Sequence, residues 1–284
     1  MAIRIVTDSS SDLSVKEQKE LDITILPLKI IFDEVEYLSG VTISSGEFYE
    51  KLSQSPRLPT TSQPSIVDMD SLFRPMLENG DDVVAVFISG RMSGTIQNAL
   101  IVKQELGALG ERLHIVDSET VTFALAALVV EAVRMRDSGM SAAMLAEELE
   151  RIKKNIRLYA VVDTLKYLQM GGRINGVQAV VGGMLGIKPL ITIENGLVEN
   201  ICRERGKQRA FQKLYEIVCA CDMDMSRTKY MGNTNNKNAF TEYKSFLEQA
   251  GLDFDFSDFR NCDIGPTVGV HVGPGALGLS FFVK

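Results

Sequence analysis

The chain has 284 residues, enough for about two domains that each bury a core of their own. Hydrophobic residues make up 45% of the sequence and charged residues 24%, which are the proportions of a soluble globular protein. The net charge of −7 and the pI of about 5.1 argue against a nucleic-acid partner, and more weakly against binding to an anionic membrane.

The sequence shows no pattern typical of export or membrane insertion. Its first residues turn polar after Val6, so we expect no secretory signal. The most apolar stretch, residues 123–133, includes Glu131 and is too short to cross a bilayer. We therefore expect a cytoplasmic protein with no transmembrane segment. No C-x-x-C pair occurs, which favours reduced thiols and no metal site; the cysteines are Cys202, Cys219, Cys221 and Cys262.

Strand-like and helix-like segments alternate in the first half of the chain. Apolar runs predict strands at residues 3–7, 23–31, 82–88 and 113–117. Pro27 interrupts the second run, which indicates an edge strand or a bend at that point.

Helices are predicted between these strands. Capping boxes of the form S-x-x-E begin helices at Ser14 and Ser44. Residues 53–64 contain three prolines, which is typical of a loop. Further helices are predicted from about residue 65, at 95–106, at 123–136 and after 141. The order βαβαβα predicts an α/β domain with a doubly wound parallel sheet.

The second half of the chain has α+β character with antiparallel pairing. Strands are predicted at residues 158–162, 189–193, 197–201, 228–231, 267–271 and 279–283, and helices at 208–221 and 237–250. Asn195 and Gly196 favour a type I′ turn between the second and third of these strands. We place the domain boundary near residue 160, which gives an N-terminal domain at 1–160 and a C-terminal domain at 161–284.

The most informative segment follows the strand at residues 82–88. Residues 89–94 form a turn rich in glycine and hydroxyl groups, and a helix begins at Thr95. Ligands collect outside the carboxyl ends of the strands in open α/β sheets, and the first N–H groups of a helix favour an anion. Ser93 therefore either caps this helix or donates a hydrogen bond to a ligand.

Other polar groups offer further candidates. Hydroxyls at residues 60–65 precede a second helix, so two helix starts either converge on one oxyanion or are ordinary caps. A third polar turn covers residues 7–12. His271, in a glycine-rich turn, is a better site candidate than His114, which lies in an apolar strand. Arg173 follows two glycines and either contacts a carboxylate or phosphate or is solvated at a helix end.

Two motifs do not fit the chemistry that they resemble. Residues 273–278 match G-x-G-x-x-G but lie too near the end of the chain for a βαβ unit, so we predict no dinucleotide cofactor. Ser93 is not in a G-x-S-x-G elbow, because Arg91 and Thr95 occupy the two glycine positions.

Seven segments of the sequence, taken in order, form a specific combination: residues 7–13, 59–65, 89–97, 116–118, 171–174, 187–190 and 271–279. Together they resemble the DegV family, whose FakB-type members bind fatty acids. The resemblance extends over essentially the whole chain.

The resemblance implies two α/β domains with an acyl chain buried between them. It also implies that the hydroxyls of Thr61 and Ser93 hold the carboxylate, with Ser62 and His271 near the head group. Together with the helix start after Ser93, this gives the expected ligand-binding residues: Thr61, Ser62, Ser93, Gly94, Thr95 and His271.

FakB-type proteins present the bound fatty acid to a separate kinase, which makes an acyl phosphate with ATP. The resemblance therefore implies a binding protein that is not an enzyme, with a fatty acid as ligand and no further cofactor. It places Arg173 and Arg205 on the surface that faces the kinase. Residues 121–124 depart from the family pattern, since many relatives have a glycine there, and this leaves the preferred chain length open.

Two alternatives stay open beside the fatty-acid carrier. A serine-dependent hydrolase or acyl transferase would use Ser93 as nucleophile and His271 as base. A binding protein for a non-lipid ligand, such as a phosphorylated metabolite, is suggested by Arg173 and the glycine turns. We expect the carrier.

Overall fold

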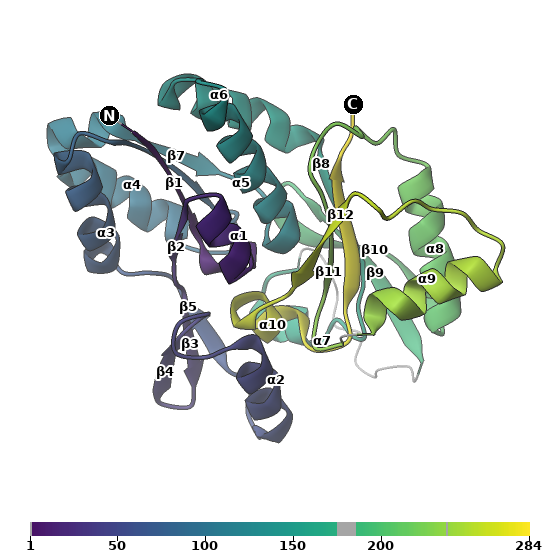
Figure 1. Ribbon diagram of the computed structural model, residues 1–284. Helices are drawn as coiled ribbons and strands as arrows, with labels where there is room; N and C mark the ends of the chain where they lie inside the picture. Colours follow the sequence, from purple (N-terminus) through teal and green to yellow (C-terminus); the bar gives the residue numbers. More distant parts are fainter. Residues whose placement is uncertain (1, 175–185, 237) are drawn as a thin grey trace.

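The computed structural model describes residues 2–174, 186–236 and 238–284. Figure 1 shows two large sheets with helix α5 (Thr122–Asp137) between them, and a small three-stranded sheet at one end of the molecule. The fold class predicted from the sequence, a parallel α/β sheet followed by an α+β part, is confirmed.

The first sheet has four parallel strands in the order β2-β1-β6-β7. They are β1 (Ile3–Asp8), β2 (Ile23–Leu26), β6 (Asp82–Phe87) and β7 (Leu113–Asp117). The chain places β2 on one side of β1 and β6 on the other. The switch point, where doubly wound sheets bind their ligands, therefore lies at the carboxyl ends of β1 and β6.

Helices cover both faces of this sheet. Alternate residues of β6 point to opposite sides. Val83 and Phe87 pack with α3 (Ile66–Glu78) and α4 (Thr95–Glu105), whereas Val84 and Val86 pack with α5 and α6 (Ala142–Ile152). This explains the continuous apolar run of the strand. The other helical elements around this sheet are η1 (Ser9–Ser11), α1 (Val15–Glu20), η2 (Gly107–Arg112) and η3 (Lys153–Asn155).

A small antiparallel sheet follows β2, and the chain enters it just after Pro27, where the interruption was predicted. It consists of β3 (Lys29–Phe32), β4 (Val35–Leu38) and β5 (Thr60–Ser62), with α2 (Ser45–Gln54) beside it. The predicted loop at 53–64 was wrong for β5. Thr61 pairs with Ile30 of β3, so a partner strand decides the structure there although the local sequence favours a loop.

The second sheet has six strands in the order β10-β9-β8-β13-β11-β12. They are β8 (Ile156–Val161), β9 (Ile187–Glu194), β10 (Leu197–Arg205), β11 (Lys229–Asn233), β12 (Phe259–Asp263) and β13 (Leu277–Phe282). The β9–β10 turn is confirmed: Asn195 and Gly196 have φ of 49° and 75°, as a type I′ turn requires. The domain boundary expected near residue 160 falls within β8 and stays a prediction.

The helices of the second half are α7 (Lys166–Gly171), α8 (Lys207–Cys219), α9 (Ala239–Gln249) and α10 (Pro266–Val272). The strand predicted at residues 267–271 was wrong, because this segment is α10. Its alternating valines favour a strand, but Pro266 stands in the first turn of the helix, where its missing N–H costs no hydrogen bond.

Helix α5 is buried over residues 122–133 and contacts strands of both large sheets. A helix covered on several sides is apolar all round, and this explains the most hydrophobic stretch of the sequence. Among the described residues, no helix is long and apolar enough to cross a membrane.

Candidate functional site

A pocket lies between the two large sheets, beside the switch point of the first. Its empty space is about 560 Å³, including the part open to solvent, which suits a small-molecule ligand. Both halves of the chain contribute to its lining. The residues are Leu28, Thr61, Gln63, Ile88, Met92, Ser93, Val121, Leu168, Arg173, Val198, Thr267, Val268, His271 and Val272.

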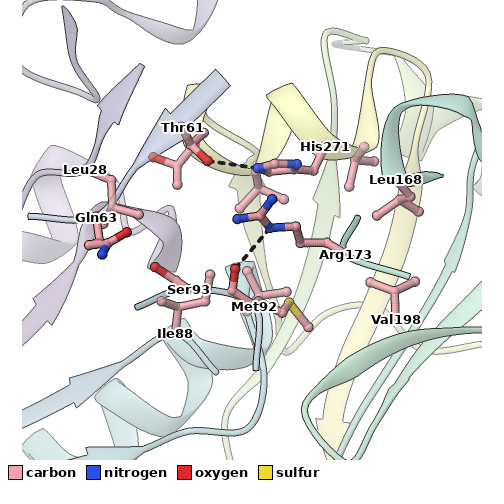
Figure 2. A pocket seen from close by; sticks show the side chains of 14 residues that line it. Leu28, Thr61, Gln63, Ile88, Met92, Ser93, Leu168, Arg173, Val198 and His271 are labelled. Carbon is pink, nitrogen blue, oxygen red and sulfur yellow. Dashed lines mark hydrogen bonds between the residues drawn. The ribbon is translucent and has the colours of Figure 1, made fainter. Parts of the chain in front are cut away.

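Thr61 and His271 meet in this pocket from β5 and α10. The Thr61 hydroxyl and Nε2 of His271 form a hydrogen bond of 3.0 Å, drawn in Figure 2. The other ring nitrogen, Nδ1, is buried without a partner among the described residues. Burial and the nearby Arg173 cation lower the pKa of His271 to about 4, so its ring is neutral at pH 7.

Ser93 ends the turn between β6 and α4. Its Oγ is 2.9 Å from the Oγ1 of Thr95 and accepts a hydrogen bond of 3.4 Å from the Thr95 amide. The N-cap of α4 is Gly94, which has no side chain that can accept from the first turn. The partial positive charge of this helix start therefore lies beside the pocket.

Arg173 brings a full positive charge into the pocket. Figure 2 shows Thr61, Gln63 and Ser93 on one side of the site, with the guanidinium of Arg173 extending toward them from the other. Its Nε donates to the Met92 carbonyl at 3.1 Å, and its Nη1 donates to the carbonyl of Gly171.

The remaining predicted residues have different positions. Ser62 donates a hydrogen bond of 3.3 Å to the carbonyl of Gln63 and is not among the pocket-lining residues. Thr95 is fully buried and supports Ser93. Arg205 is exposed on β10, outside the pocket. The kinase-facing role expected for Arg173 and Arg205 stays a prediction.

Gln63 is a site residue that the sequence reasoning missed. A Cβ atom at Gly94 would lie 2.7 Å from Nε2 of Gln63, so this glycine lets the amide approach the start of α4. The signal for Gln63 in the sequence was its position, because it directly follows the hydroxyl residues of segment 59–65 and precedes Pro64. Single apolar lining residues such as Val121 and Val198 gave no signal, because they resemble core residues at the ends of elements.

The polar turn at residues 7–12 positions the site. Asp8 accepts a hydrogen bond of 2.8 Å from the Ile88 amide and thereby ties the carboxyl ends of β1 and β6 together. The Ser9 hydroxyl is 3.1 Å from that of Thr267 on α10, which lines the pocket. These bonds connect the first sheet to α10, the helix that carries His271.

The arrangement suits an anion with an apolar body. The hydroxyls of Thr61 and Ser93, a helix start and the Arg173 guanidinium are available for the anion. The other polar lining residues are Gln63, Thr267 and His271. Eight apolar side chains complete the lining: Leu28, Ile88, Met92, Val121, Leu168, Val198, Val268 and Val272. Among the described residues, no group of three His, Cys, Asp or Glu side chains could hold a metal ion.

Comparisons with known proteins agree over the full length of the chain. A family model described as an uncharacterised protein of the DegV family matches residues 2–284. A DegV domain-containing protein of Deinococcus radiodurans is 34% identical over 282 residues, which cover 99% of this chain and 98% of the relative.

Solved structures show the same fold. A DegV family protein from Thermus thermophilus, described as fatty-acid binding, has a TM-score of 0.86 and 29% identity, with 100% of both chains covered. A stearic-acid-binding protein from Eubacterium ventriosum has a TM-score of 0.83 and 30% identity, covering 100% of this chain and 99% of its own. Sequence, fold and full-length coverage agree, and the chain therefore belongs to the DegV family.

Proposed function

We propose that this chain binds a long-chain fatty acid in the pocket between its sheets. The carboxylate is held by the hydroxyls of Thr61 and Ser93, with Arg173 supplying positive charge, and the acyl tail lies against the apolar lining. The observation that carries the proposal is the combination of these three groups with apolar walls in one pocket. The fatty acids of the Thermus thermophilus and Eubacterium ventriosum relatives support it.

The energetics fit such a ligand. Burying a CH₂ group is worth about 0.8 kcal/mol, so a tail of about 14 methylenes gives on the order of 11 kcal/mol before the costs of binding are subtracted. The tail therefore supplies most of the affinity. The head group needs only a few hydrogen bonds to fix the orientation of the carboxylate, and a hydrogen bond to a charged group contributes about 1.5–3 kcal/mol.

The proposal extends to presentation of the fatty acid to a separate kinase, with this chain carrying out no chemistry itself. A hydrolase would need Ser93 within reach of a base. In the described structure Ser93 is hydrogen-bonded to Thr95, and His271 is hydrogen-bonded to Thr61. This favours the carrier over the hydrolase alternative.

Mass spectrometry of organic extracts from the purified protein, followed by binding of added palmitate and oleate, tests the carrier. Thr61→Val and Ser93→Ala are each expected to weaken binding about tenfold or more, because each removes a hydrogen bond to a carboxylate. Thr60→Val is the matched control, since neighbouring residues of a strand point to opposite faces and Thr60 is exposed. Lipid-free protein that takes up neither fatty acid would overturn the proposal.

Two assays test the finer claims. A fatty-acid kinase with ATP is expected to form acyl phosphate only when the loaded protein is present, and Arg173→Gln and Arg205→Gln are expected to reduce that rate. Turnover of a p-nitrophenyl ester that is lost in Ser93→Ala would instead favour the hydrolase.

A further inference from the structure

A second, polar cavity lies where strands β8 and β9 separate. Its empty space is about 930 Å³, including the part open to solvent. We call it the β8–β9 groove. It is lined by Glu119, Thr120, Lys153, Lys154, Ile156, Arg157, Leu158, Tyr159, Thr192, Ile193, Glu194 and Asn195. None of these residues lines the pocket proposed for the fatty acid.

The groove exists because the pairing of β8 with β9 stops early. Tyr159 pairs with Thr192, but the three preceding residues of β8 have their partners only in β13 along the described ladders. The tip of the β9–β10 hairpin is held elsewhere. Ser89 Oγ donates to the Gly196 carbonyl at 2.7 Å, and Arg91 Nη1 donates to the Asn195 carbonyl at 2.7 Å. Both bonds attach the hairpin tip to the turn after β6.

The charge of the groove is opposite to that of the chain. Its lining has three cationic and two anionic side chains, although the whole chain carries −7. Lys153 is neutralised by ion pairs with Glu119 and Glu150. Within the described structure, Lys154 and Arg157 form no ion pair; Arg157 Nη1 donates to two backbone carbonyls and leaves its other donors unused.

Thr120 lines this groove and carries an unsatisfied hydroxyl. The residue is 1% exposed, and its Oγ1 has no hydrogen-bond partner among the described residues. A buried hydroxyl without a partner destabilises the folded state, so such groups usually have a partner. The Thr120 hydroxyl is itself buried, so rotation of the side chain toward the groove would let an acceptor bound there provide the partner.

We infer that the β8–β9 groove binds a small anion that bears a phosphate or carboxylate group. The Thr120 hydroxyl and the Arg157 guanidinium donate hydrogen bonds to it, and Lys154 contributes charge. Guanidinium groups bind both anions through paired N–H donors. The inference is independent of the fatty acid, because the two cavities share no lining residue.

The inference is tested by titrating the full chain with inorganic phosphate and, separately, with acetate. The amide chemical shifts of residues 119–120 and 192–195 report binding. Saturable shifts are expected for at least one of the two. Stronger binding of phosphate would identify a phosphate-bearing ligand, and stronger binding of acetate a carboxylate. Thr120→Val and Arg157→Gln are each expected to weaken binding about tenfold, as the loss of one charge-assisted hydrogen bond predicts.

The controls separate binding from folding. Arg74→Gln removes the same charge from α3, outside the groove, and is expected to leave the titration unchanged. Thr120→Val removes an unpartnered hydroxyl, so it is expected to melt at the same temperature as the wild type or higher in anion-free buffer. The absence of saturable shifts in the wild type would overturn the inference, and so would equal affinity in the wild type and both groove variants.

Discussion

The imidazole of His271 lies so close to the backbone of Gly171 that a Cβ atom on this glycine would overlap Nδ1 of the ring. Gly171 is the last residue of α7, and the glycine after it, Gly172, has the left-handed φ of 68° typical of a helix C-cap. The two glycines therefore have different roles. The first makes room for His271, and the second ends the helix.

Replacing Gly171 by alanine is expected to displace His271 and break its hydrogen bond to Thr61. We predict that Gly171→Ala weakens palmitate binding about tenfold, because the Thr61 hydroxyl loses the partner that orients it for the carboxylate. Gly46→Ala, in α2, is the control because a Cβ there meets no atom within 4 Å. Equal affinity in Gly171→Ala and wild type would show that the position of His271 does not matter for the ligand.

His271 is expected to make the folded state sensitive to acid. Its folded pKa of about 4 lies below the unfolded value of about 6.5. Below pH 6.5 the unfolded chain binds a proton that the folded chain does not, so stability falls as the pH decreases from 6.5 to 4, by on the order of 2–3 kcal/mol. Urea midpoints of His271→Gln should decrease less over this range, whereas His114→Gln should resemble the wild type more closely.

Asp12 is expected to have the opposite effect on the pH dependence of stability. Its carboxylate accepts hydrogen bonds from Thr122 Oγ1 at 2.6 Å and from the Gly265 amide at 3.0 Å. Burial raises its pKa to about 7 in spite of these bonds. The folded state keeps a proton that the unfolded chain releases above pH 4, so this residue reduces stability as the pH rises from 4 to 7.

Asp12→Asn removes this titration while keeping the size of the side chain. From pH 5 to pH 8, the urea midpoint of Asp12→Asn is expected to rise relative to that of the wild type. Asp253→Asn, at an exposed position, is the control. A difference that is independent of pH would show that Asp12 does not change its protonation on unfolding.

Phe123 packs against bare backbone in the second sheet. A Cβ atom on Gly232 of β11 would overlap its ring, and one on Gly278 of β13 would lie 2.9 Å from its Cζ. Gly232→Ala is expected to lower the free energy of unfolding by about 1–3 kcal/mol through overpacking. The same change made in a Phe123→Ala background should cost at least about 1 kcal/mol less, because the clashing ring is gone. Additive effects would contradict this packing.

Long apolar runs and capping boxes predicted most of the fold. The strands at β1, β6 and β7 and the capping boxes of α1 and α2 are confirmed, because their signals are local. Strands β4, β5 and β12 and helix α10 were not predicted. The three strands depend on pairing with partner strands, β3 for the first two and β11 for the third. Helix α10 has valines that alternate as in a strand but begins at a proline.

The candidate site was partly predictable from the hydroxyl clusters at helix starts and from the resemblance to the DegV family. Thr61, Ser93 and His271 were expected and line one pocket. Residue type alone could not show that Arg173 lies inside the pocket, since this depends on the path of the chain after α7. The apolar lining was not predictable either, because a valine beside a ligand and a valine in the core have the same local sequence pattern.

Thr120 and Val121 are consecutive residues, yet the first lines the β8–β9 groove and the second lines the pocket. They form a partition one residue thick. Its flanking residues, Glu119 and Thr122, are held at φ of 52° and 53°, which non-glycine residues rarely adopt. If an anion in the groove changes the affinity for the acyl chain, the acyl chain changes the affinity for the anion by the same factor.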